Sequence, residues 1–430
     1  MDHEVVRIGH YNDGRSENKG NEPENVLYAE AKGDKYLFVC SERSNVVFVY
    51  EVSDPSAPEL RQTLPVGVAP EGLTFIPEEN LFVVASEKDD REDGFRSAIS
   101  VFKLVKSKKP EYPTLVSSPR NAQAGTSIPF GRMSGLGGSV TDKNCLFAVS
   151  MNRVLMIDTS SFPATVVAET PIVDTNGVIN ESCVPLDYCV DEVVNADGTL
   201  GEDIRIKDIA NVGEGVHWIV SGKKPNLLLQ VTDGVISDCV AIEHPSDPDM
   251  TLDGAEGIAV QGNKIVVAMG EVAEEETMPR IMVYNTDSQS WKYVFYSLED
   301  PGSQYTEDDL DHPSLSDMAS LGQGKFLVSE VDETGGPDAY SGVKKIFSID
   351  LGDFSFADGS VLTKELFLDL LAEPLTDTAP FLVGVGGLAV NGGDVWVHNA
   401  VNALEYRLKK VAKAKQGKIG KKTKAPKSRN

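Results

Sequence analysis

The chain has 430 residues, 41% of them hydrophobic, and a formal net charge of −26 at pH 7. Because the hydrophobic content is that of a globular protein, the charge does not indicate disorder. No apolar run approaches the ~18 residues that a membrane-spanning helix needs. The N-terminus, MDHEVVRIGHYNDG, is acidic and has no hydrophobic signal core. These features predict a soluble chain without a transmembrane segment, and they leave the compartment open.

Seven segments share one pattern: an apolar strand, a turn rich in Gly, Asn or Asp, and a second apolar strand. PEGLTFIPEENLFVVASE (70–87) and AEGIAVQGNKIVVAMGE (255–271) are two of them. The others are 23–42, 133–152, 207–223, 315–330 and 385–399. A third strand follows each hairpin, and a fourth usually follows that. This repetition predicts an all-β fold, a seven-bladed β-propeller of four-stranded antiparallel blades.

The two ends of this propeller are predicted to meet. The seventh repeat lacks an obvious fourth strand, whereas the N-terminal EVVRIGHY reads as a strand without a repeat of its own. If Val5–Tyr11 pairs with Ala403–Leu408, two exposed sheet edges are removed at once. The propeller is then one domain over residues 4–408, closed by its N-terminal strand, and we expect a monomer.

The last 22 residues, 409–430, carry nine Lys, one Arg and no acidic residue. Such a segment is expected to be a disordered basic tail, separate from the fold. It suits contact with an anionic surface or polymer. The acidic body argues against nucleic acid as the main ligand.

The five cysteines form no CxxC pair, which argues against a structural zinc site. Cys40 and Cys145 lie in apolar strands and are expected to be buried as small hydrophobic residues. Cys183 and Cys189 flank a short Pro-containing loop and are a candidate disulfide in an oxidising compartment. Asn180 begins a glycosylation sequon, which needs the same compartment.

The ends of the hairpin strands carry recurrent carboxylates. In a propeller, the start of the first strand and the end of the second share one face of the ring. We therefore expect the following carboxylates around one channel mouth: Glu24 with Glu42, Glu71 with Glu87, Glu256 with Glu271, and Asp317 (next to Ser316) with Glu330. Carboxylates gathered in this way are typical ligands of a divalent cation, above all Ca²⁺. The alternative is that each Glu is simply solvated.

Two lysines break the acidic pattern. Lys207 and Lys223 occupy the positions of Glu71 and Glu87 at the same sixteen-residue spacing. They are either counter-ions of the acidic arc or donors to a phosphate or carboxylate of a substrate, with Arg132 as a third donor. His398, beside Asn399 at the end of the last hairpin, is a candidate general base or a structural histidine.

Several common active-site motifs are absent. The chain has no GxSxG, HExxH, Walker loop or strand-associated GxGxxG, so the α/β-hydrolase, zincin, NTPase and Rossmann classes are excluded. The acidic insertion 174–203 contains NADG, which fits a turn better than a calcium loop.

Two stretches resemble known families. The segment from Ser44 to Glu87, with VYEVSDP and PEGLTFIP, is similar to the choice-of-anchor I type of propeller. The second half, with GAEGIAV, LSDMASLGQGKFLVSE and GGLAV, resembles the phytase-like family named for esterase-like activity. The resemblance covers roughly residues 4–408. It implies a seven-bladed propeller, export, and phosphoesterase activity, with Glu71 and Glu256 at the Glu of the two motifs.

Three functions follow from these observations. The first is a metal-dependent phosphoesterase, in which the cation polarises a phosphoryl oxygen and activates a water, and the lysines neutralise the developing charge. The second is a non-catalytic Ca²⁺-binding or interaction propeller of a matrix or cell surface. The third is a lactonase-like hydrolase. Fold alone does not choose among them.

Overall fold

The computed structural model describes residues 1–89, 97–105, 112–120, 125–131, 133–180, 183–184, 193–222, 226–245, 252, 254–273, 276–300, 313–332, 343–372, 384–401 and 405–410. The fold is all-β, as predicted, and its strands form seven sheets that are almost entirely antiparallel. No helix in the described ranges is long and apolar enough to cross a membrane.

The first two sheets follow one another in the chain. Sheet one consists of β1 (Pro23–Ala31), β2 (Asp34–Ser41), β3 (Val46–Glu51) and β4 (Glu59–Pro65). Sheet two consists of β5 (Pro70–Ile76), β6 (Leu81–Ser86) and β7 (Ala98–Lys103). They pack on each other through β1 and β5, around an aromatic core that includes Phe38 stacked on Phe82 at 4.1 Å.

Sheets three to five come next. Sheet three contains β9 (Gly135–Gly138), β10 (Cys145–Ser150), β11 (Arg153–Asp158), β12 (Ala164–Pro171) and, parallel to β12, the edge strand β8 (Leu115–Ser117). Sheet four contains β13 (Ile206–Gly213), β14 (Val216–Ser221), β15 (Leu227–Thr232) and β16 (Val235–Ala241). Sheet five contains β17 (Ala255–Gln261), β18 (Lys264–Met269), β19 (Arg280–Asn285), β20 (Ser290–Phe295) and the parallel β24 (Ser360–Val361).

The last two sheets complete the fold. Sheet six contains β21 (Ser314–Gly322), β22 (Lys325–Val331), β23 (Lys344–Asp350) and β25 (Lys364–Asp369). Sheet seven contains β26 (Gly384–Asn391), β27 (Asp394–Val401) and β28 (Glu405–Lys410). All seven hairpins predicted from the sequence are present as adjacent antiparallel strands.

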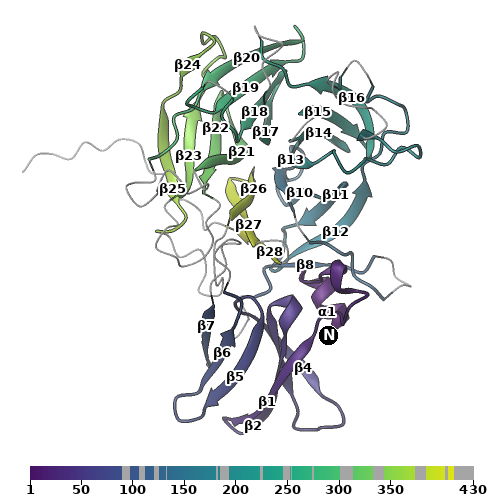
Figure 1. Ribbon diagram of the computed structural model, residues 1–430, viewed down its shortest axis with the longest axis vertical. Coiled ribbons are helices and arrows are strands. Elements are labelled where there is room, and N and C mark those ends of the chain that lie inside the picture. Colours follow the sequence, from purple (N-terminus) through teal and green to yellow (C-terminus); the bar gives the residue numbers. More distant parts are fainter. Residues whose placement is uncertain are drawn as a thin grey trace, which may run out of the picture.

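Five of the sheets surround one axis. Their innermost strands contact one another in the order β9, β13, β17, β21, β26 and back to β9. Figure 1 shows these sheets around a common centre, with the first two sheets set to one side, below them in this view. The structure therefore differs from a single ring of seven, because direct contact between β26 and β9 closes the ring after five sheets.

The predicted N-terminal closing strand is wrong. Residues Asp2–Arg7 form the helix α1, and Val5 and Ile8, three positions apart, are both buried. They pack with Val46, Phe48 and Val116 between sheet one and β8, while Glu4 and Arg7 form an ion pair at 2.7 Å. Apolar residues at this spacing lie on one face of a helix, whereas a strand would turn alternate residues outward.

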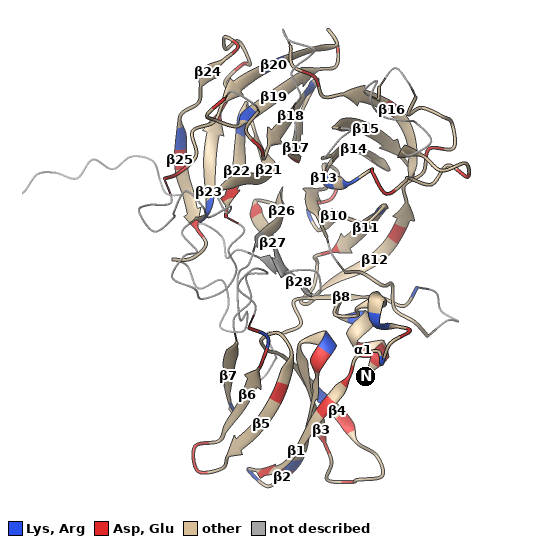
Figure 2. Cartoon of the chain, viewed as in Figure 1, with Lys and Arg blue, Asp and Glu red and all other residues tan. Residues whose placement is uncertain are grey.

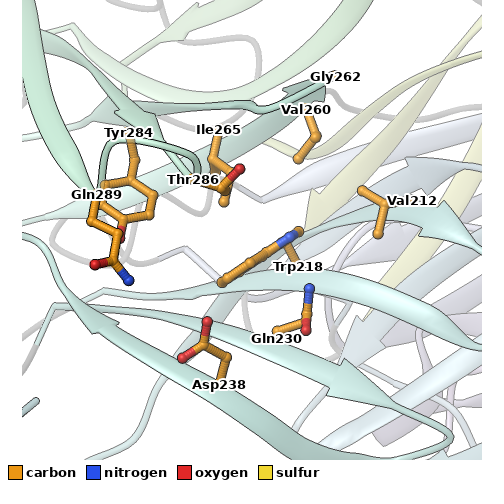
Figure 3. Close-up of a pocket in the computed structure, with 10 residues that line it drawn as sticks. All are labelled: Val212, Trp218, Gln230, Asp238, Val260, Gly262, Ile265, Tyr284, Thr286 and Gln289. Atoms are coloured by element: carbon orange, nitrogen blue, oxygen red, sulfur yellow. The ribbon is translucent and has the colours of Figure 1, made fainter.

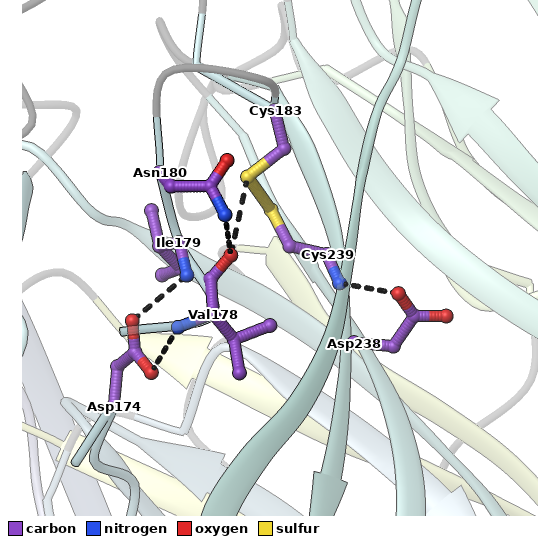
Figure 4. Close-up of a disulfide and its surroundings, with 7 residues drawn as sticks. All are labelled: Asp174, Val178, Ile179, Asn180, Cys183, Asp238 and Cys239. Carbon is purple, nitrogen blue, oxygen red and sulfur yellow. Dashed lines mark hydrogen bonds between the residues drawn. A yellow bond between two sulfur atoms is a disulfide. The ribbon is translucent and has the colours of Figure 1, made fainter. Parts of the chain in front are cut away.

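The disulfide also differs from the expectation. Cys183 is joined to Cys239 of β16 across 56 residues, and Cys189 lies outside the described residues. Figure 4 shows the adjoining loop held by Asp174, whose carboxylate accepts the N–H groups of Val178 and Ile179, each at 2.8 Å. Cys40 and Cys145 are buried free thiols, as predicted.

The last described strand, β28, ends at Lys410, two residues into the segment that we expect to be a separate tail. Residues 411–430 of that segment lie outside the described residues.

Candidate functional site

The first strands of five hairpins share a local irregularity at the positions that the sequence pattern aligns. In each of β5, β13, β17, β21 and β26 the register with the next strand shifts by one residue, at Glu71, Lys207, Glu256, Ser316 and Gly386 respectively. A β-bulge bends the strand and re-aims the side chain that it carries. The aligned residues are therefore set apart structurally, and not only by sequence.

Four of the predicted carboxylates, Glu24, Glu42, Glu71 and Glu87, gather at the ends of the first two sheets. Oxygen atoms of Glu42, Glu71 and Glu87 all lie within 4.8 Å of one another, as do those of Glu22, Glu24 and Glu42. Glu42 follows β2, Glu71 is the bulge of β5, and Glu87 follows β6. We call these five residues the glutamate cluster. Figure 2 shows acidic and basic residues side by side at the ends of these sheets that face the ring.

Backbone contacts set the shape of the glutamate cluster. The Glu42 N–H donates to Glu22 O at 2.9 Å, and the Glu87 N–H donates to Ala69 O at the same distance. The Ala69 N–H donates to Asn45 Oδ1 at 2.9 Å, and the Asn25 side chain donates to Glu71 O at 2.8 Å. The two sheets are thus tied together next to the carboxylates.

The inner half of the cluster is electrostatically crowded. Glu22 contacts Arg15 and accepts from Arg43 at 3.1 Å, and Arg43 also reaches Glu42 at 2.7 Å. Burial and the hydrogen bond to Glu22 raise the pKa of Glu42 to about 7. Burial also acts on Glu22, but hydrogen bonds from Glu42, Arg15 and Arg43 lower its pKa to about 2. The Glu42 carboxylate is therefore a position that favours a proton or a cation.

The remaining predicted carboxylates lie in the ring and do not join the glutamate cluster. Lys207 Nζ lies 2.5 Å from Glu256 Oε1. Of the two alternatives for this lysine, the contact agrees with a counter-ion and not with a donor to a substrate. Glu271 follows β18 and is exposed at the same end of this hairpin as Glu256. Glu330 is fully buried and accepts from Lys364 at 2.7 Å and from Tyr296 at 3.1 Å. Glu330 is thus held in an internal ion-pair network.

Asp317 lies at the axis of the ring. It is fully buried, contacts the buried Asp208, and accepts the Leu388 N–H at 2.7 Å. Asp208 accepts the N–H groups of Leu136 at 3.1 Å and Ile258 at 2.7 Å. Asp317 is therefore a core residue and does not face a channel mouth, because the step after the bulge turns it inward.

Three further candidate residues from the sequence are His398, Lys223 and Arg132. His398 on β27 is fully buried, which removes it from any surface that a substrate reaches. Lys223 and Arg132 lie outside the described residues. Sequence reasoning missed Glu22, whose signal was its place directly before the Pro23 that opens the first hairpin, and Arg43, which directly follows the predicted Glu42.

The glutamate cluster fits a hard divalent cation. Metal–oxygen distances of about 2.3–2.6 Å allow two ligand oxygens to lie up to about 5 Å apart, and the oxygens of Glu42, Glu71 and Glu87 meet that limit. The donors are all carboxylate oxygens, and Glu71 and Glu87 are exposed, so a cation held there faces solvent.

Comparison with known proteins gives the family. The family model described as "Esterase-like activity of phytase" matches residues 128–397, and that of the choice-of-anchor I domain matches residues 6–55. No curated protein matches. A solved structure titled luciferin-regenerating enzyme is similar at 11% identity with a TM-score of 0.34, over 79% of this chain and 91% of that chain.

Proposed function

Since the chain belongs to the phytase-like family described by esterase-like activity, we propose that it is a metal-dependent hydrolase of phosphate esters. The observation that carries the proposal is the convergence of Glu42, Glu71 and Glu87 on a volume that suits one divalent cation. Ca²⁺ is the favoured ion, because the donors are all oxygens and come from three separate segments, a flexible set that suits a large cation.

The residues around the cation divide into two groups. Glu42 is the buried anchor, held by Arg43, while Glu71 and Glu87 hold the solvent side. A bound cation supplies a Lewis acid for a phosphoryl oxygen and lowers the pKa of a bound water. Arg43 is 35% exposed and is the cationic group beside Glu42, so we assign it the role of orienting the anionic substrate. Lys207 is left as the counter-ion of Glu256.

A panel of phosphomonoesters, assayed with Ca²⁺ and with chelator, tests the proposal. Glu71→Gln and Glu87→Gln should lower turnover by about 10²-fold or more, in line with the loss of one electrostatic group from an active site. Glu79→Gln, an exposed residue in the turn of the same hairpin, is the matched control and should keep full activity. Activity that survives both the chelator and the two cluster variants contradicts the proposal.

A second candidate is a non-catalytic calcium-binding propeller of a matrix or cell surface. It is supported by position, because the glutamate cluster lies outside residues 128–397, the part matched by the phytase-like family. The Cys183–Cys239 disulfide supports an oxidising compartment. Ca²⁺ binding that is lost in Glu71→Gln, with no turnover of any phosphate ester, would favour this second function.

A further inference from the structure

A cleft of about 330 Å³ lies between sheets four and five. It is near the turns of their hairpins, away from the end that carries the bulge residues. It is lined by Val212, Trp218, Gln230, Asp238, Val260, Gly262, Ile265, Tyr284, Thr286 and Gln289. Figure 3 shows the Trp218 and Tyr284 rings on its walls, with the polar groups of Gln230, Asp238 and Gln289 around them. Its volume is within the range of about 300–1,000 Å³ that is usual for small-molecule sites.

The strand registers create this cleft. Trp218, Gln230 and Asp238 are direct cross-strand partners on β14, β15 and β16, so their side chains form one row on one face of sheet four. Val260, Ile265 and Tyr284 form a corresponding row across β17, β18 and β19 of sheet five. The cleft is the space between the two rows.

The position of the cleft separates it from the proposed catalytic site. Gly262 and Gln289 lie in the turns that join β17 to β18 and β19 to β20. Lys207 and Glu256 mark the opposite ends of the inner strands. The glutamate cluster belongs to sheets one and two, which contribute nothing to the cleft lining.

The polar groups of the cleft are available for a ligand. Trp218 and Tyr284 are each only 6% exposed, and the indole N–H and the phenol O–H make no hydrogen bond to another side chain or carbonyl in the described ranges. Asp238 accepts the Cys239 N–H through Oδ1 at 2.9 Å, which leaves Oδ2 without a partner in the described part of the chain. Asp238 is exposed, and the polar atoms of Trp218 and Tyr284 keep contact with solvent, so a ligand in the cleft can bond to all three groups.

The chemistry of the lining selects the class of ligand. Neither Lys nor Arg is among the lining residues, and Asp238 is the charged one, so an anion is disfavoured. The indole, phenol, amide and carboxylate groups of the lining offer both donors and acceptors, and the exposed parts of the two aromatic rings add a small apolar surface. We propose that this cleft binds one neutral polyhydroxylated ring, a monosaccharide or a cyclitol, which bonds through its hydroxyls and rests against the exposed edges of the two rings.

Tryptophan fluorescence tests this proposal on the full chain. The chain has three tryptophans, and two of them report on the cleft: Trp218 lines it, and the Trp291 ring lies 4.9 Å from the Tyr284 ring. Titration with D-glucose, D-galactose, D-mannose and myo-inositol should give a saturable change with at least one of them. Asp238→Asn should weaken binding by about tenfold, the loss expected for a hydrogen bond to a charged group.

Matched variants complete the experiment. Trp218→Phe should remove most of the signal, whereas Trp396→Phe, which alters sheet seven, should keep it. Because Trp218 belongs to a packed core, the exposed Asp238 is the safer test if the Trp218 variant is unstable. Glucose 6-phosphate should bind at least about tenfold more weakly than glucose, since neither Lys nor Arg is among the described residues that line the cleft.

Three results would overturn the proposal: no saturable change with any of the four probes, tighter binding of glucose 6-phosphate than of glucose, or unchanged binding in a folded Asp238→Asn protein. None of these results bears on the phosphoesterase proposal, because the cleft and the glutamate cluster lie on different sheets. For the same reason, Glu71→Gln should leave saccharide binding unchanged.

Discussion

Asp208 of β13 and Asp317 of β21 meet at the axis of the five-sheet ring, where neither is exposed to solvent. Through their carboxylates they accept backbone N–H groups from β9, β17 and β26, so the pair links all five inner strands. Two carboxylates in contact cannot both be ionised in a dry interior, so one of them carries a proton. Burial and the contact with Asp208 raise the pKa of Asp317 well above its ordinary value, which makes Asp317 the donor of that proton.

This pair predicts that stability depends on pH. Burial raises the pKa of Asp208 from 3.8 to about 7, and burial and the contact with Asp208 raise that of Asp317 well above 3.8, so the folded chain binds more protons than the unfolded chain across this range. Because the folded state holds the extra protons, the free energy of unfolding should fall as pH rises from about 4 to above 7. Urea denaturation at a series of pH values measures this slope.

The Asp317→Asn variant isolates the contribution of the pair. Its amide N–H replaces the shared proton, so we expect near-normal stability at neutral pH and a flatter slope than in the parent. Asp34→Asn, at an exposed position of sheet one, should retain the parent slope. A variant slope equal to that of the parent would show that the pair does not titrate as proposed.

Close approach of the inner strands gives a second prediction. A Cβ added at Gly257 would lie 2.7 Å from the backbone carbon of Asp317, a contact that only backbone movement can relieve. Gly257→Ala should therefore destabilise the fold by about 1–3 kcal/mol or more. Gly213→Ala is the matched control, since the nearest atom there is 3.8 Å away. Equal melting temperatures for the two variants would contradict the close packing.

The sequence predicted the local structure well and the arrangement of sheets poorly. Each hairpin has a turn marked by Gly, Asn or Asp between apolar strands, and these signals correctly located pairs such as β5–β6 and β17–β18. Which inner strands share one axis depends on contacts between sheets, such as β9 with β26, and no local pattern encodes them. The N-terminal segment was misread because the pair Val5 and Ile8 suits a helix as well as an irregular strand.

Alignment of the hairpins predicted which residues occupy the bulge position. It did not predict which carboxylates lie close together in the folded chain. Aligning the hairpins located the bulge residues, among them Glu71 and Glu256, because the repeat carries its bulge at a constant place. The same alignment put Asp317 with the mouth residues, although one step along a strand reverses the side-chain direction. The grouping of Glu42, Glu71 and Glu87 without Glu256 follows from the separation of the first two sheets from the ring.

Calcium binding at the glutamate cluster should depend on pH. Since burial and the contact with Glu22 raise the pKa of Glu42 to about 7, this carboxyl is protonated at pH 5.5 and ionised at pH 8. Proton and cation compete for it, so the rise in melting temperature on adding Ca²⁺ should be small at about pH 5.5 and larger at about pH 8. At a hundredfold excess over Kd the stabilisation is about 2.7 kcal/mol.

Glu42→Gln tests the origin of this pH dependence. The variant should bind Ca²⁺ more weakly at pH 8 and lose the difference between the two pH values, because Gln does not titrate. Glu79→Gln should behave like the parent. If Ca²⁺ leaves the melting curve of the parent unmoved at both pH values, the cluster does not hold this cation.

A buried ion pair in sheet six gives a further prediction. Lys344 Nζ lies 2.6 Å from Asp332 Oδ1, and both side chains are 0% exposed. Lys344→Met leaves the carboxylate buried without its cation and should cost about 3–5 kcal/mol of unfolding free energy. Adding Asp332→Asn should recover a large part of that loss. If the double variant is less stable than Lys344→Met, the cost comes from packing and not from the charge.

The Cys183–Cys239 disulfide should make stability depend on the redox state. It closes a loop of 56 residues between the insertion and β16, and a loop of this length stabilises the fold by about 4 kcal/mol in the chain-entropy account. A phosphine reductant should therefore lower the melting temperature of the parent. The double variant Cys183→Ser, Cys239→Ser should start at the lower melting temperature and be insensitive to reductant.

The pairing of the cysteines can be checked chemically. Cys40 and Cys145 are buried free thiols and should remain unmodified by alkylating agents in the native state. Peptide mapping without reduction should yield the 183–239 cross-link, and recovery of a 183–189 link in its place would refute the assignment.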